Sequence, residues 1–276
     1  LAEHALGALP PTPSSGTWVT YVRCHDDIGW AIDDGDAAAV GLTGAGHRRF
    51  LSDWYAGEFP GSPAEGLVFQ HNPDTGDRRV SGTTAALTGL GPSRRDPDGA
   101  FARLFLAHAL IAVWGGIPVI WSGDEVASPG DSAWADDPAH AADNRWVHRP
   151  AVTDADRAAC REPGSDAQRA YDGVAHVMRT RAGLPMLHAE APVDLVPGLD
   201  DGVLGVLRRH PSGTLLGLVN VTGEHRPVPH HVITHHVADP REVLSHHTID
   251  PDDAGLSWMP PYAAWWIIEF TDASSR

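Results

Sequence analysis

Residues 96–121 read DPDGAFARLFLAHALIAVWGGIPVIW, and this stretch decides the fold class. Asp96-Pro97-Asp98 is typical of a helix start, and the apolar residues that follow recur at roughly helical spacing. Gly115-Gly116 ends the predicted helix. Residues 117–121 are then a short continuous apolar run, which is typical of a strand covered on both faces in a parallel sheet.

A second strand is predicted upstream at residues 17–24 (TWVTYVRC), which are rich in β-branched and aromatic side chains. Strand, connection, helix and strand together indicate a βαβ unit. Residues 31–97 of the connection are rich in Gly, Asp and Pro, with a short helical piece near residues 48–55. They are too long for a simple connection, so we interpret them as a functional insertion that acts as a lid or subdomain beside a pocket.

The pattern changes beyond residue 184. A second helix is predicted at residues 167–181, and short alternating runs separated by turns follow it. These runs predict an all-β domain, a sandwich, so we expect two domains, residues 1–184 and 185–276. The clearest runs are GVLGVLRR at 202–209, TLLGLVNVT at 214–222, VPHHVITHHV at 228–237 and AAWWIIEF at 263–270.

Composition narrows the possible partners. The chain carries 36 acidic and 20 basic residues, all of them Arg, for a formal net charge of −16. Nucleic acid and anionic membranes are therefore disfavoured as main partners, because like charges repel. Two distant cysteines build neither a disulfide framework nor a CxxC metal site. Without an uninterrupted membrane-length apolar stretch or a charged signal segment, we expect a soluble, cytoplasmic protein, with secretion left open.

His25-Asp26-Asp27 follow the first predicted strand, at the end where barrel enzymes gather catalytic groups. The alternative is an Asx-type turn with a capping Asp. In the loop after the second strand, Arg145 in DNRWVHRP (143–150) could hold a carboxylate of the first strand by two parallel hydrogen bonds, or form a surface salt bridge. Asp124 and Glu125 either point to the same rim or cap a turn.

Four stretches together resemble, in the same order, the part of amylosucrases that runs from barrel strand seven to the loop after strand eight. Amylosucrases belong to the α-amylase superfamily, glycoside hydrolase family 13. The resemblance implies an α/β fold: the C-terminal part, about strands 7–8, of a (β/α)8 TIM barrel with a long strand-7 insertion, followed by a β-sandwich. The stretches are YVRCHDDIGW (21–30), NPDTGDRRVSGTTAALTGL (72–90), GGIPVIWSGDEVA (115–127) and DNRWVHRP (143–150).

The resemblance also implies a role for each matching residue. Asp26 matches the carboxylate that stabilises the transition state, and His25 matches a histidine that hydrogen-bonds glucosyl hydroxyls. Asp27 and Arg145 match a salt bridge that closes the bottom of the pocket. Arg79 and Arg48 match arginines on the acceptor side, although each has an Arg neighbour that leaves the alignment open by one residue.

The implied activity is retaining glucosyl transfer from sucrose to an α-1,4-glucan, with no cofactor and no metal. Such chemistry needs a nucleophile and an acid/base carboxylate roughly 5 Å apart. In the family these lie on strands four and five, upstream of Leu1, so we expect this chain alone to be inactive. Leu1 also opens inside an uncapped helical pattern, which predicts a longer polypeptide.

Two alternatives stay open. One is a trehalose synthase or another isomerase or hydrolase of the superfamily, which the combination of Asp27 and Arg145 disfavours. The other is a non-catalytic carbohydrate-binding fragment, in which Trp258, Trp265 and Trp266 form a stacking platform instead of filling a sandwich core. Paired histidines such as His230-His231 match no standard zinc spacing, and we interpret them as solvent-facing strand residues.

Overall fold

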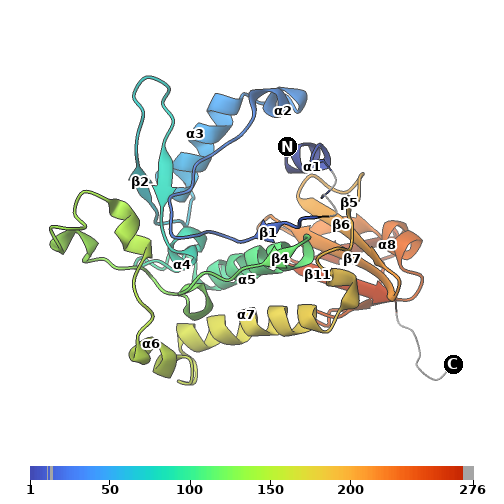
Figure 1. Cartoon of the computed structure of the whole chain (residues 1–276). Coiled ribbons are helices and arrows are strands. Elements are labelled where there is room, and N and C mark those ends of the chain that lie inside the picture. The colour runs from blue at the N-terminus through green and yellow to red at the C-terminus, as the bar shows by residue number, and fades with distance from the viewer. Residues whose placement is uncertain (11, 13–14, 270–276) are drawn as a thin grey trace. The chain divides into compact units, whose positions relative to one another are not determined.

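The computed structural model describes residues 1–10, 12 and 15–269 (Figure 1). Two compact units account for the chain. Unit 1 consists of residues 1–8, 21–104 and 120–173, and unit 2 of residues 9–20, 105–119 and 174–276. The units do not part at residue 184. Residues 17–20 and 117–119 of the two predicted strands, and residues 174–181 of the second predicted helix, also fall in unit 2. A domain boundary at residue 184 in a complete enzyme stays a prediction.

The βαβ unit is present, with shorter strands than predicted. β1 (Val19–Thr20) and β4 (Ile117–Pro118) pair in parallel, and α5 (Pro97–Val113) is the predicted helix between them. Val19 is 56% exposed and Ile117 50% exposed, so the prediction of a strand covered on both faces is wrong here. The physical reason is that this ladder has two strands only, so each has an open edge and little packed against it.

Unit 2 is built on a five-stranded antiparallel sheet in the order β5-β6-β7-β11-β9, four of whose strands are labelled side by side in Figure 1. β8 and β10 pair in a second antiparallel sheet. An apolar core that includes Leu216, Trp265 and Met259 joins residues of both sheets, and a separate β-sandwich domain at residues 185–276 stays a prediction. The strands are β5 (Val193–Leu195), β6 (Val203–His210), β7 (Gly213–Asn220), β8 (Arg226–Pro229), β9 (Pro240–Glu242), β10 (Leu256–Met259) and β11 (Ala264–Glu269).

One predicted strand is wrong. Of residues 228–237, the part from His230 onward forms helix α8 (His230–His236) instead of continuing β8. Ile233 and Val237 are buried in the core, and their spacing of four residues suits one face of a helix. The His230-His231 pair therefore lies on a helix, which corrects our interpretation of these histidines as strand residues.

Two arginines terminate α5 within unit 2. Arg208 is fully buried and donates to the carbonyls of Val113, Trp114, His188 and Ala191. Arg181 donates to the carbonyls of Ala112, Gly116 and Leu187. The last carbonyls of a helix have no partner inside it, so these guanidiniums satisfy them and place positive charge at the negative end of the helix.

Asn220 holds the corner after β7. Its side chain is fully buried, and its amide nitrogen donates to the carbonyls of Glu224, Met259 and Pro260. Its amide oxygen accepts from the main-chain nitrogen and the hydroxyl of Thr222. The side chain thus supplies the hydrogen bonds that this turn cannot make with its own backbone.

Unit 1 contains the whole predicted insertion, residues 31–97, which has more regular structure than its composition indicated. β2 (Leu67–Phe69) and β3 (Arg79–Ser81) form an antiparallel hairpin, and the helical piece predicted near residues 48–55 is α3 (Gly44–Tyr55). The remaining helices of unit 1 are α1 (Ala2–Gly7), α2 (Asp34–Ala39), α4 (Thr84–Thr88) and α6 (Asp154–Ala159), with 3-10 turns η1 (Asp124–Val126), η2 (Trp134–Asp136) and η3 (Asn144–His148).

α7 (Asp166–Ala182) is the second long helix predicted from the sequence, and η4 (Pro185–Leu187) follows it. Its residues Val177 and Met178 pack in a second apolar core of unit 2, together with Val113 of α5 and Trp266 of β11. Within the described part of the chain, no helix combines the length and the apolar character needed to cross a bilayer.

Candidate functional site

A buried ion pair fixes the segment that leads into His25-Asp26-Asp27. Arg23 Nε and Nη2 lie 2.9 and 2.8 Å from Asp124 Oδ1, and both side chains are only 2% exposed. Asp124 therefore does not face an open rim. Arg23 Nη1 also donates to the carbonyls of Cys24 and His148. Because leaving one buried charge unpaired is costly, this pair holds the backbone just before the acidic residues.

Four charged side chains from three separate segments meet at this point. Arg145 Nη1 lies 2.6 Å from Asp26 Oδ1 and 3.7 Å from Asp27 Oδ1. Arg79 Nη1 lies 3.2 Å from Asp27 Oδ2. Asp27 is nearly buried, with a side chain 3% exposed, whereas the side chain of Asp26 is 51% exposed. Asp26 is thus the carboxylate that a ligand can reach.

The partners of Arg145 differ from the expected single salt bridge with Asp27. The bidentate contact of Arg145 goes to Asp143, with Nε to Oδ1 and Nη2 to Oδ2 both at 2.8 Å. Its remaining nitrogen, Nη1, binds Asp26 more closely than Asp27. Asp27 has its shorter contact with Arg79, which selects Arg79 over Arg78, because Arg78 binds Asp53 and Glu58.

The guanidinium of Arg145 controls the ionisation of its neighbours. Its hydrogen bond lowers the pKa of Asp26 to about 2, and the pKa of Asp143 is lowered by the same guanidinium. The two carboxylates in turn raise the pKa of Arg145. Asp26 therefore keeps its negative charge throughout the neutral and weakly acidic range.

His25 is placed by its main chain and by stacking. Its imidazole lies against Trp121, with ring centroids 5.2 Å apart and an angle of 23° between the planes. Its carbonyl oxygen accepts from Arg149 Nε at 2.8 Å and contacts His148 Nε2 at 2.9 Å. A pocket of about 410 Å³ opens here, lined by His25, Trp121, Ser122, His148, Arg149 and Pro150.

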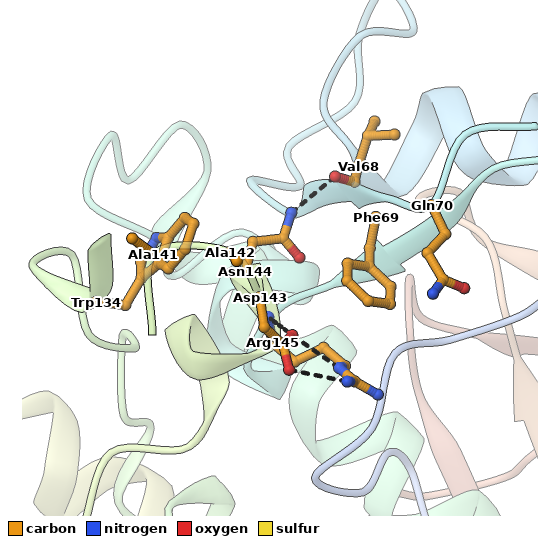
Figure 2. A pocket seen from close by; sticks show the side chains of 9 residues that line it. All are labelled: Val68, Phe69, Gln70, Trp134, Ala141, Ala142, Asp143, Asn144 and Arg145. Atoms are coloured by element: carbon orange, nitrogen blue, oxygen red, sulfur yellow. Dashed lines mark hydrogen bonds and ion pairs between the residues drawn. The ribbon is translucent and has the colours of Figure 1, made fainter. Parts of the chain in front are cut away.

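A larger pocket, of about 580 Å³, has Arg145 in its lining (Figure 2). Phe69 and Gln70, at the end of β2, form one wall, and the Arg145 guanidinium lies 4.8 Å from the Phe69 ring centroid. Figure 2 shows the Asn144 amide reaching the carbonyl of Val68, at 2.7 Å. Gln70 has a φ of 51°, a left-handed conformation that is uncommon for residues other than glycine. The full lining is Val68, Phe69, Gln70, Trp134, Ala141, Ala142, Asp143, Asn144 and Arg145.

Arg48 is used inside the insertion. Its Nη1 donates to the Ile32 carbonyl and to Asp34, and its Nε lies 3.2 Å from Asp77. The structure therefore gives Arg48 three acceptors of the insertion as partners and does not bring it into the four-residue cluster. Its neighbour Arg49 is 78% exposed and lies 3.9 Å from Asp53.

Sequence reasoning missed three residues of this site: Arg23, His148 and Asp143. The only sequence signal for the first two was their place inside the stretches YVRC and VHRP, next to residues already singled out. Asp143 precedes Arg145 by two residues, a spacing at which a capping carboxylate can bind the main-chain nitrogen and the side chain together. Across the described ranges, no cluster of three or more His, Cys, Asp or Glu could hold a metal ion.

The three tryptophans of unit 2 behave differently from one another. Trp265 and Trp266 are 1% and 0% exposed; Trp265 lies in the core shared by the two sheets, and Trp266 lies in the second core with α5 and α7. Trp258 on β10 is 47% exposed, and its indole nitrogen donates to Asp252 Oδ2 at 2.8 Å. A stacking platform made of all three residues is therefore wrong, while Trp258 alone presents a fixed aromatic ring to solvent.

No family model matches the chain. Among solved structures, it is similar to AmyP in complex with maltose, with 14% identity over 70% of this chain and 39% of that one, and a TM-score of 0.46. It is similar to an α-amylase from Geobacillus thermoleovorans complexed with acarbose, with 18% identity, 70% and 38% coverage, and a TM-score of 0.45. It is also similar to the trehalulose synthase MutB, with 14% identity, 67% and 41% coverage, and a TM-score of 0.47. The chain spans less than half of each of these proteins.

Proposed function

We propose that this chain supplies the sugar-binding and charge-stabilising part of the active site of a retaining α-glucosyltransferase of the amylosucrase kind. Its donor is sucrose and its acceptor is an α-1,4-glucan. The observation that carries the proposal is the convergence of Asp26, Asp27, Arg79 and Arg145 from three separate segments. The resemblance of the same segments to amylosucrase motifs supports this choice of donor and acceptor.

The proposed chemistry follows from the ionisation of Asp26. A glucosyl unit that leaves its donor passes through a transition state with positive charge on the ring. Asp26 stays anionic because Arg145 lowers the pKa of its carboxyl to about 2, and its side chain is half exposed. A fixed negative charge of this kind lowers the barrier without reorganising during the reaction. We propose that Asp26 binds sugar hydroxyls and stabilises this charge.

The remaining residues shape the pocket in this proposal. His25, held flat against Trp121, donates to glucosyl hydroxyls, and Asp27 with Arg145 and Arg79 closes the pocket around one terminal unit. Arg79 is 54% exposed, which suits a residue that also meets the acceptor. Retaining transfer also needs a nucleophile and an acid/base carboxylate, and the proposal assigns neither role to Asp26 or Asp27.

The test uses the complete protein, sucrose and a short α-1,4-glucan, with fructose release as the readout. We expect Asp26→Asn to lower kcat by at least about 10²-fold, because the amide carries no charge to stabilise the ring. Asp98→Asn is the matched control, since Asp98 is 93% exposed and has one 3.4 Å contact with Arg169. The proposal fails if Asp26→Asn keeps wild-type turnover.

The products separate this proposal from its relatives. Fructose together with a lengthened glucan supports transfer, whereas free glucose in the presence of acceptor indicates a hydrolase. A disaccharide isomeric with the sucrose supplied indicates an isomerase. Each outcome is distinguished by chromatography of the same reaction mixture.

A second candidate function, carbohydrate binding without catalysis, is favoured by Trp258. Exposed aromatic rings stack on the apolar faces of sugars, and the bond to Asp252 keeps this ring in one orientation. A complete protein that binds glucans but converts neither sucrose nor maltose would support this candidate over the first.

A further inference from the structure

One buried imidazole links all the segments that carry the charged cluster. His148 ends η3 and is 2% exposed. Its Nδ1 accepts a hydrogen bond from the main-chain N–H of Gly82 at 3.0 Å. Since Nδ1 accepts, the ring proton lies on Nε2, which donates to the His25 carbonyl at 2.9 Å. A single neutral tautomer satisfies both contacts.

The two partners and the ring lie next to the cluster in sequence. Gly82 directly follows β3, which begins at Arg79. His25 directly precedes Asp26, and His148 shares η3 with Arg145. The ring therefore ties together the three segments that supply Asp26, Asp27, Arg79 and Arg145, although it touches none of the four carboxylates and guanidiniums.

The surroundings keep this ring neutral and in place. Burial lowers the pKa of His148 to about 4, and the nearby guanidiniums of Arg23 and Arg149 act in the same direction, against Asp26 and the His25 carbonyl. Arg23 Nη1 lies 3.3 Å from the His148 carbonyl, so the buried Arg23–Asp124 pair fixes the backbone of this residue as well. Both of these guanidiniums are themselves paired, Arg23 with Asp124 and Arg149 with Asp143.

We propose that His148 is a positioning residue: its Nε2-protonated ring sets the main chain of His25 and thereby the contact between Asp26 and Arg145. The effect on turnover rests on the proposed function, whereas the effect on Asp26 does not. His148 acts through the His25 carbonyl and the Gly82 amide. Displacing reacting groups by about 1 Å can cost about 10²-fold in rate, so such a residue matters without being part of the chemistry.

The first measurement is independent of activity. In the complete protein, nitrogen-detected NMR at neutral pH should show His148 Nδ1 unprotonated and Nε2 protonated, and the Gly82 amide should be protected from hydrogen exchange. Carboxyl NMR should then show the pKa of Asp26 rising from about 2 toward its ordinary value in His148→Phe, which removes both hydrogen bonds. A proton on Nδ1, or an unchanged pKa of Asp26 in a folded His148→Phe variant, would overturn the proposal.

Two further variants distinguish positioning from a general loss of stability. The His148→Gln side chain can still donate to the His25 carbonyl, so we expect the pKa of Asp26 in this variant to stay close to its lowered wild-type value. His176→Phe is the matched control, because His176 Nε2 contacts the Leu244 carbonyl at 2.6 Å in unit 2, whereas the cluster belongs to unit 1. It should leave the pKa of Asp26 unchanged even if it lowers the melting temperature. If the pKa of Asp26 rises as much in His176→Phe as in His148→Phe, His148 has no positioning role.

Activity is the second readout. We expect His148→Phe to lower kcat about tenfold to 10²-fold with little change in KM for sucrose, and His148→Gln to recover part of the loss. A folded His148→Phe variant with wild-type kcat would contradict the proposal. If the wild-type protein does not convert sucrose, the proposed function fails, and the NMR results alone decide the role of His148.

Discussion

Arg145 is the residue on which the site depends most, because its guanidinium contacts three carboxylates at once. Asp143 takes two of its nitrogens, and Nη1 faces Asp26 and Asp27. The arrangement restricts the Arg145 side chain, and it keeps Asp26 and Asp143 charged at neutral pH. An alanine here would leave Asp26 without its strongest partner and Asp27 with Arg79 as its remaining close cation.

The pH dependence of Arg145→Ala follows from the lowered pKa of Asp26 and Asp143. A carboxyl whose pKa is depressed in the folded state stabilises the protein above its unfolded pKa, and this contribution is lost as the pH falls through the folded value. Near pH 6 we expect the wild-type protein to have a higher melting temperature than Arg145→Ala. This difference in melting temperature should disappear as the pH falls from about 4 to about 2.

Thermal unfolding midpoints of both proteins at a series of pH values check this expectation. Arg157→Ala is a suitable control, because Arg157 and its partner Asp154 are 63% and 98% exposed and such pairs contribute little. A constant difference between wild type and Arg145→Ala down to pH 2 would contradict the assigned cause.

At the level of elements, regular patterns predicted the helices well and the strands less well. α5 and α7 carry long apolar stripes with clear starts, and both have the predicted bounds within two residues. The prediction of a strand at residues 228–237 was wrong because the spacing of Ile233 and Val237 fits a helix as well as it fits an interrupted strand alternation. The hairpin β2–β3 was hidden in a polar, Gly-rich insertion, where three-residue strands leave almost no periodic signal.

The end of α5 gives a stability prediction with a built-in control. Arg208→Met should remove the donors for four carbonyls of unit 2 and destabilise the chain by at least about 3 kcal/mol, because each buried acceptor without a partner costs about 1–3 kcal/mol. Arg209→Met should change stability by less than about 1 kcal/mol, because Arg209 is 56% exposed and pairs with Asp194 at the surface.

Urea unfolding of the two variants measures this difference directly. Similar unfolding midpoints for Arg208→Met and Arg209→Met would mean that the Arg208 contacts do not terminate α5 in solution. Burial also lowers the pKa of Arg208 to about 10, which still leaves it charged at neutral pH. The comparison can therefore be made between pH 6 and pH 8 without a change in its protonation.

At the scale of the whole molecule, the sequence predicted the contact of Arg145 with a carboxylate at residues 26–27 but not the other long-range contacts around it. His25, Asp26, Asp27, Arg79 and Arg145 were singled out, and the structure brings their segments together. The pair Arg23–Asp124 joins residues 101 positions apart, and no local pattern encodes such a contact. Arg48 was placed by alignment alone; in the structure it binds acceptors of the insertion, and its role on the acceptor side stays a prediction.

The chain on its own should not turn over sucrose. In the proposed mechanism neither Asp26 nor Asp27 is the nucleophile or the acid/base carboxylate, and both are already engaged by Arg145 and Arg79. We expect no fructose above background from residues 1–276 alone, measured over hours at a protein concentration where the complete enzyme is readily detected. Fructose release that depends on Asp26 would show that these residues contain a whole active site.

The buried corner at Asn220 has a consequence for production in eukaryotic hosts. Asn220-Val221-Thr222 has the acceptor pattern for N-linked glycans, yet the amide nitrogen that would carry the sugar donates to three carbonyls inside the fold. A glycan attached during translocation would occupy the volume of that corner and break these bonds. In a secretory pathway, glycosylation of Asn220 would therefore prevent the turn after β7 from forming its hydrogen bonds. Asn220 is the position to inspect by mass spectrometry in misfolded material.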